Sequence, residues 1–95
     1  MENKKIISCQ ISFYPLNTIK VNEEVKEVLK IIDESGLRYE SNALSTIVYG
    51  NVRNVYSLLE DITLKMDKNE SEFAISLNIS NSCGCEITES NPATN

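Results

Sequence analysis

The chain has 95 residues, 41% hydrophobic and 24% charged, a balance that predicts one small globular domain and excludes a largely disordered chain. Nine basic and fourteen acidic residues give a net charge of -5, which disfavours nucleic acid and anionic lipid surfaces as partners. The absence of histidine removes the commonest general base and metal ligand, and three glycines leave no glycine-rich phosphate loop. We therefore expect no catalytic residues, no metal and no cofactor.

The amino-terminal segment shows no targeting signal or membrane span. Residues 1–5 are polar, and the apolar run that follows is interrupted by Ser8, Gln10 and Ser12. Three cysteines is an odd number, which favours free thiols in a reducing compartment over a disulfide framework. These features predict a cytoplasmic protein that does not bind membranes.

Residues 6–14 alternate between apolar and polar side chains, with the period of a strand that is covered on one side only. Pro15 lacks a backbone N–H and is predicted to end this strand. The apolar face is formed by Ile7, Cys9, Ile11 and Phe13, and the polar face by Ser8, Gln10, Ser12 and Tyr14.

A helix is predicted over residues 23–35, with Asn22 as its cap and Gly36 as a left-handed terminating residue. Residues 37–40 and 47–49 are two short strands that form an antiparallel hairpin. The clearest helix begins at Val52 and runs to Met66. Its apolar positions recur at helical spacing: Val52, Val55, Leu58, Leu59, Ile62 and Met66.

The last predicted strand covers residues 73–80, after a charged connection over residues 67–72. Its apolar side chains, expected to face the helices, are Phe73, Ile75, Leu77 and Ile79. Its opposite face carries Ala74, Ser76, Asn78 and Ser80.

The element order βαββαβ predicts an α+β ferredoxin-like sandwich, with a four-stranded antiparallel sheet and two helices on one face. The first and last strands are expected at or near the centre of the sheet. We expect a single domain over residues 1–87 and a frayed, disordered tail over residues 88–95, which is polar and aperiodic.

The sheet face opposite the helices carries small neutral side chains, which allow another surface or a flat ligand to approach the backbone closely. Because a two-layer fold leaves this face uncovered, we expect it to be buried by a second copy, in a dimer or tetramer. The Cys83 and Cys85 pair could chelate a soft metal, form a strained disulfide or act as a nucleophile. No further metal ligand and no neighbouring base is evident, so a turn with small side chains is the simpler interpretation.

Three segments together carry a family resemblance. Residues 10–16 read QISFYPL, residues 44–52 read LSTIVYGNV and residues 78–83 read NISNSC. They resemble the YkoF-type hydroxymethylpyrimidine and thiamine-binding family and its single-repeat relatives, over about residues 8–85. The resemblance implies ferredoxin-like domains that associate through their sheets and bind a thiamine-precursor pyrimidine without turnover.

The same resemblance implies a ligand site at the polar sheet face near a subunit interface. Members that bind thiamine carry acidic residues in the hairpin, where this chain has Asn42 and Ala43. The alternative is a regulatory or structural oligomer of the same fold without a small-molecule ligand. The implied ligand-binding residues are Gln10, Ser12, Tyr14, Ser45, Thr46, Asn78 and Ser80.

Overall fold

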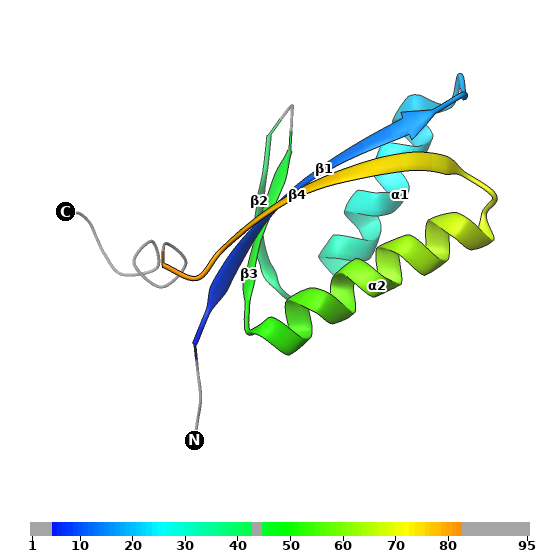
Figure 1. The fold of residues 1–95 in the computed structure, drawn as a ribbon. Coiled ribbons are helices and arrows are strands. Elements are labelled where there is room, and N and C mark those ends of the chain that lie inside the picture. The colour runs from blue at the N-terminus through cyan, green and yellow to red at the C-terminus, as the bar shows by residue number, and fades with distance from the viewer. Residues whose placement is uncertain (1–4, 43–44, 83–95) are drawn as a thin grey trace.

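A computed structural model describes residues 5–42 and 45–82 of the chain. The elements are β1 (Ile7–Leu16), α1 (Val21–Glu34), β2 (Arg38–Ser41), β3 (Thr46–Gly50), α2 (Val52–Lys68) and β4 (Glu72–Ser80) (Figure 1). Their order and the four-stranded antiparallel sheet confirm the predicted ferredoxin-like fold. The predicted tail over residues 88–95 and the cysteine pair lie outside the described residues.

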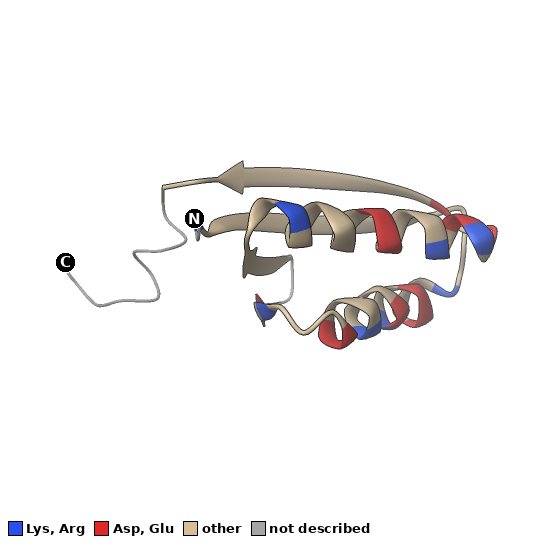
Figure 2. Ribbon diagram, turned by 90° about the horizontal axis from the view of Figure 1, so that it is seen from below, with Lys and Arg blue, Asp and Glu red and all other residues tan. Residues whose placement is uncertain are grey.

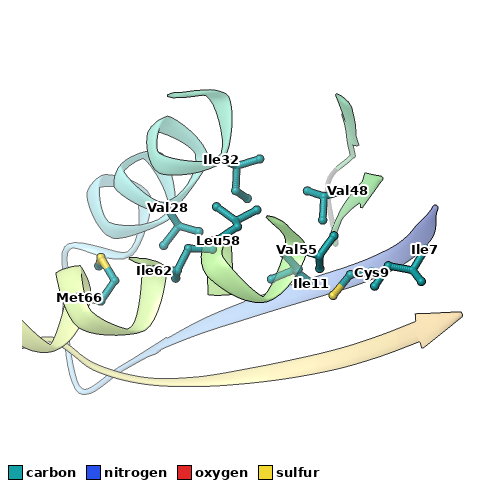
Figure 3. Packing of buried hydrophobic residues seen from close by; sticks show 10 residues of the cluster. All are labelled: Ile7, Cys9, Ile11, Val28, Ile32, Val48, Val55, Leu58, Ile62 and Met66. Atoms are coloured by element: carbon teal, nitrogen blue, oxygen red, sulfur yellow. The ribbon is translucent and has the colours of Figure 1, made fainter. Parts of the chain in front are cut away.

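The strands lie in the order β2-β3-β1-β4, and every neighbouring pair is antiparallel. β1 and β3 are therefore central. β4 is an edge strand, which corrects the expectation that the last strand lies near the centre of the sheet. Both helices pack on the same face, with α2 between α1 and β4 (Figures 2 and 3).

The core lies between the sheet and the two helices and follows the predicted alternation of β1. Cys9 and Ile11 are 0% and 3% exposed, and Phe13 packs against the core from its margin. Figure 3 shows the side chains of Cys9 and Ile11 on the side of β1 that faces α1 and α2. The buried cluster consists of Ile7, Cys9, Ile11, Val28, Ile32, Val48, Val55, Leu58, Ile62 and Met66.

The apolar face of β4 is only partly covered. Leu77 lies opposite Ile11 in the register, so it points to the helix side as the alternation predicts. Leu77 and Ile79 nevertheless remain 41% and 43% exposed. Leu77 therefore faces the helix side as expected but is not buried in the core, because β4 is an edge strand with a neighbour on one side only.

Pro15 does not end β1, contrary to the prediction. The strand continues to Leu16, and Pro15 lies opposite Phe73 of β4. Pairing of β1 with β3 stops at Ile11, so beyond that residue β1 has only β4 as a neighbour. Proline is tolerated in such a stretch because one edge of the strand needs no backbone donor.

The helix ends differ in how they are capped. Asn22 lies inside α1, whose N-cap is Lys20 without a side-chain hydrogen bond, so the predicted role of Asn22 is wrong. Gly36 has a φ of +80°, which confirms it as the left-handed residue after α1. At α2 the cap is Asn51, whose side-chain oxygen accepts a hydrogen bond of 2.8 Å from the backbone N–H of Asn54.

This contrast predicts that two asparagine substitutions lower the free energy of unfolding by different amounts. Asn51→Ala should lower the free energy of unfolding by about 1 kcal/mol, because a backbone donor of the first turn of α2 loses its acceptor. Asn22→Ala is the matched control and should be neutral or slightly stabilising, because alanine favours the helix interior. Urea denaturation measures both variants. Equal costs would contradict the cap assignment.

Candidate functional site

The open face of the sheet, turned away from the helices, is polar along β1 and β4 and mixed along β2 and β3. The register places Gln10 between Ile47 of β3 and Asn78 of β4. Ser8 lies beside Tyr49 of β3 in the same way. The open face therefore offers hydroxyl and amide groups next to one aromatic ring and one aliphatic side chain.

Tyr49 lies on the open face but is only 4% exposed. The guanidinium carbon of Arg38 lies 4.7 Å from the centre of its ring, the geometry of a cation–π contact. Arg38 also lies 3.7 Å from Glu40 on the same strand. These contacts fix the β2 side of the open face, while the β1 and β4 side consists of shorter side chains.

The open face carries a shallow hollow of about 400 Å³, here called the sheet-face hollow. Its size lies within the range of about 300–1,000 Å³ that small-molecule sites occupy. The hollow is lined by Ser8, Gln10, Ile47, Tyr49, Asn78, Ile79 and Ser80.

A second cavity of about 120 Å³, the hairpin pocket, lies between α1 and the end of the β2–β3 hairpin. One wall is apolar and the other carries hydroxyl and amide groups. Its volume is below the range of drug-sized sites, about 300–1,000 Å³, so it suits one small ring. It is lined by Ile11, Phe13, Val25, Val28, Leu29, Ser41, Asn42, Ser45 and Thr46.

The polar wall of the hairpin pocket is organised by hydrogen bonds within the hairpin. The hydroxyl oxygens of Ser41 and Thr46 lie 3.0 Å apart, and Thr46 is 6% exposed. Only one of the two hydroxyls donates in this pair, so the other keeps its hydrogen for a further acceptor. The Asn42 side-chain oxygen accepts a hydrogen bond of 3.0 Å from the Ser45 backbone N–H, which holds the turn.

One hydrogen bond connects the two hollows. The Gln10 side-chain nitrogen of β1 donates to the Ser45 hydroxyl over 3.0 Å. Gln10 lines the sheet-face hollow and Ser45 lines the hairpin pocket. The two cavities, which lie on opposite faces of the sheet, are therefore linked through one side-chain hydrogen bond at the hairpin end.

The structure divides the seven predicted site residues into three groups. Gln10, Asn78 and Ser80 line the sheet-face hollow, and Ser45 lines the hairpin pocket. Thr46 belongs with Ser45, since it also lines the hairpin pocket. It lies opposite Ile11, so its side chain points to the helix side and not to the open face, where it was predicted. The last group lies further along β1 and lines neither cavity: Ser12 and Tyr14.

The sequence prediction missed the parts of the hairpin pocket that come from elsewhere. Ser41 and Asn42 belong to the stretch interpreted only as a hairpin connection. Val25 and Leu29 lie in the helix predicted over residues 23–35, for which no part in a site was predicted, yet both are half-buried and line the pocket. The alternation of β3 from Ile47 to Tyr49 carries the signal for Thr46, because a residue just before Ile47 points to the opposite face.

Among the described residues, two groups have a shifted pKa, and neither lines the sheet-face hollow or the hairpin pocket. Burial raises the pKa of the Cys9 thiol, so this cysteine stays protonated and unreactive in the core. The Tyr39 hydroxyl donates a hydrogen bond of 3.0 Å to Asp33, and this bond with the nearby carboxylate raises the pKa of Tyr39.

In the described part of the chain, no three Cys, Asp or Glu side chains cluster as metal ligands. Within the same residues, neither helix has the length and hydrophobicity needed to cross a membrane.

Comparison with protein families matches residues 6–86 to the YKOF-related family. The chain belongs to this family. The match covers the described fold and both cavities, which lie between Ser8 and Ser80. No protein of curated function matches the sequence significantly.

Solved structures of similar fold come from bacteria and an archaeon. A Thermotoga maritima protein provisionally assigned to thiamine biosynthesis or salvage is 17% identical, with a TM-score of 0.74 over 83% of this chain and 86% of its own. A Bacillus cereus domain of unknown function is 21% identical, with a TM-score of 0.72 over 85% and 84%. A hypothetical protein from Methanocaldococcus jannaschii is 19% identical, with a TM-score of 0.70 over 80% and 79%. At these identities the likeness establishes the fold.

Proposed function

We propose that this member of the YKOF-related family is a cytoplasmic binding protein for thiamine or a thiamine-precursor pyrimidine, which it holds without turning it over. Family membership supports the proposal, as does the thiamine-related assignment of the Thermotoga maritima protein. The ligand contacts are proposed at the hairpin end of the sheet, where Gln10 of the sheet-face hollow is hydrogen-bonded to Ser45 of the hairpin pocket. Self-association through the open face belongs to the same proposal.

The observation that carries the proposal is the hairpin pocket with its unequal walls. An aminopyrimidine has flat apolar faces, an exocyclic amine that donates and ring nitrogens that accept. Phe13, Val25 and Leu29 form an apolar wall against which such a ring can lie. The hydroxyl groups of Ser45 and Thr46 form the opposite wall and can both donate and accept. These two walls therefore support the proposal, since one offers apolar contact and the other offers hydrogen-bonding groups to such a ring.

The remainder of a larger ligand would extend from this ring toward the sheet-face hollow. Gln10 stands at the boundary and can exchange its bond to Ser45 for a bond to the ligand. Thiamine also carries a cationic thiazolium ring, which an acidic protein with a net charge of -5 favours. Asn78 and Ser80 supply the polar groups of this second subsite.

The test is calorimetric titration of the wild-type protein with thiamine, hydroxymethylpyrimidine and the isolated thiazole alcohol. We expect both pyrimidine compounds to bind and the thiazole to bind much more weakly. Thr46→Val removes a hydroxyl at nearly constant volume and should weaken binding about tenfold or more, since an unmatched hydrogen bond costs about 1–3 kcal/mol. Asn78→Leu should weaken the binding of thiamine more than the binding of the pyrimidine alone.

Ser12→Ala is the matched control, because Ser12 lies on the open face but lines neither cavity. It should leave the affinity unchanged, and circular dichroism should show that all variants are folded. Absence of binding heat for thiamine, the pyrimidine and their phosphates would refute the proposal. That result would leave the alternative, an oligomeric scaffold or regulator of the same fold.

A further inference from the structure

Arg38 of β2 contacts two groups of the open face that proteins commonly use to bind organic cations. The carbon of its guanidinium lies 4.7 Å from the centre of the Tyr49 ring. One of its nitrogens lies 3.7 Å from a carboxylate oxygen of Glu40. An aromatic face and a carboxylate both attract a positive charge. The side chain of Arg38 therefore occupies the position that a bound organic cation would take.

Both partners of Arg38 lie beside the sheet-face hollow. Tyr49 is one of the residues that line the hollow. Glu40 pairs with Ile47, another lining residue, in the register of β2 and β3, so the two side chains share the open face. The described residues that line the hollow are themselves uncharged. A ligand on the β3 side of the hollow therefore meets Arg38 and Glu40, whose charges offset each other.

The hairpin pocket offers a cation no better site. The described residues of its lining are apolar or carry neutral hydroxyl and amide groups. Burying a charge without an opposite charge costs far more than burying a neutral ring. The net charge of -5 attracts a cation only through solvent, where the attraction falls away over about 8–10 Å. The groups at the two cavities therefore decide the preference, and they favour an uncharged ligand.

We propose that Arg38 is a specificity-determining residue, which fills the cation subsite of the open face and makes the protein prefer the uncharged pyrimidine to cationic thiamine. This inference rests on the proposed function and names its preferred ligand. The pyrimidine ring alone needs only the hairpin pocket, so Arg38 does not affect its binding. Thiamine must place its thiazolium ring toward the sheet-face hollow. There the guanidinium repels the thiazolium and already holds Tyr49 and Glu40.

The test is calorimetric titration of the wild type and two Arg38 variants with hydroxymethylpyrimidine and with thiamine. We expect the wild type to bind the pyrimidine about tenfold or more tightly than thiamine. Arg38→Ala should raise the affinity for thiamine about tenfold, because it releases the Tyr49 ring and the Glu40 carboxylate together. It should leave the affinity for the pyrimidine unchanged. Arg38→Lys keeps the positive charge and should keep the wild-type preference.

Two further variants separate the local contacts from the overall charge. Asn22→Asp lowers the net charge by one, as Arg38→Ala does, but Asn22 lies in α1 and lines neither the sheet-face hollow nor the hairpin pocket. It should therefore keep the wild-type preference. Glu40→Gln, added to Arg38→Ala, should remove much of the gain in thiamine affinity, because the released carboxylate is lost again. Circular dichroism should show that all variants are folded.

The outcomes distinguish this inference from the proposed function. If both ligands bind but the wild type holds thiamine as tightly as the pyrimidine, the role of Arg38 is overturned and the proposed function stands. The same conclusion follows if Arg38→Ala leaves the ratio of the two affinities unchanged, or if Asn22→Asp changes that ratio equally. Binding of neither ligand would refute both.

Discussion

Replacing Ile11 with alanine should lower the free energy of unfolding by about 2–5 kcal/mol, the cost of removing a large aliphatic side chain from the core. Ile11 is 3% exposed at the centre of β1, with strands on both sides and helices above it. The surrounding elements cannot collapse into the space, because β1 pairs with both β3 and β4. Such a loss is a large fraction of the stability of a small domain.

Leu64→Ala is the control for this prediction, since it removes a similar side chain from an exposed position of α2. Its effect should stay within about 0.5 kcal/mol, as for most surface changes. Chemical denaturation followed by circular dichroism gives both values. If Leu64→Ala cost as much as Ile11→Ala, the assignment of the covered face of β1 would be wrong.

Cys9→Ser should be the second most damaging of these substitutions, although the two side chains have nearly the same shape. Cys9 is fully buried among apolar side chains, and a hydroxyl buried without a partner costs about 1–3 kcal/mol. Cys9→Ala separates the causes, because it removes the sulfur without adding a polar group. The serine variant should therefore unfold at lower denaturant concentration than the alanine variant.

The same cysteine predicts a pH dependence of stability. Burial raises the pKa of the Cys9 thiol above its ordinary value of 9.0, so in alkali the unfolded chain releases this proton before the folded protein does. The thiol therefore leaves stability unchanged below that value and lowers it as the pH rises further. Cys9→Ala should lose less stability than the wild type between neutral and alkaline pH. A parallel decline in both proteins would contradict this.

The fold was predictable because its information is local. Alternation in β1 and helical spacing in α2 each identify an element and its buried face without knowledge of the remainder. Helix starts were less predictable, because Asn22 and Asn51 are the same residue type and only the path of the chain decides which one caps. The exposure of Leu77 depends on strand order, which alternation does not reveal.

The candidate site was predictable only in part, since cavities form between segments that are distant in sequence. The polarity of Gln10 and Asn78 indicated an unusual sheet face, and the register places them side by side. The hairpin pocket needs α1 to lie over the end of β3, and no pattern within the hairpin carries that information. The place of Ser41 in the pocket wall was therefore recognised only from its contact with Thr46 in the structure.

The overhang of β1 beyond Ile11 makes the sheet mechanically uneven. From Ser12 to Leu16 it is a two-stranded ribbon with β4, whereas earlier residues of β1 have neighbours on both sides. Two-stranded ribbons are marginal on their own. The stacking of Phe13 on Phe73, with ring centroids 5.5 Å apart, supports this one. Fluctuations that expose backbone amides should therefore concentrate at the tip of the ribbon and fade toward Cys9, where the sheet is broadest.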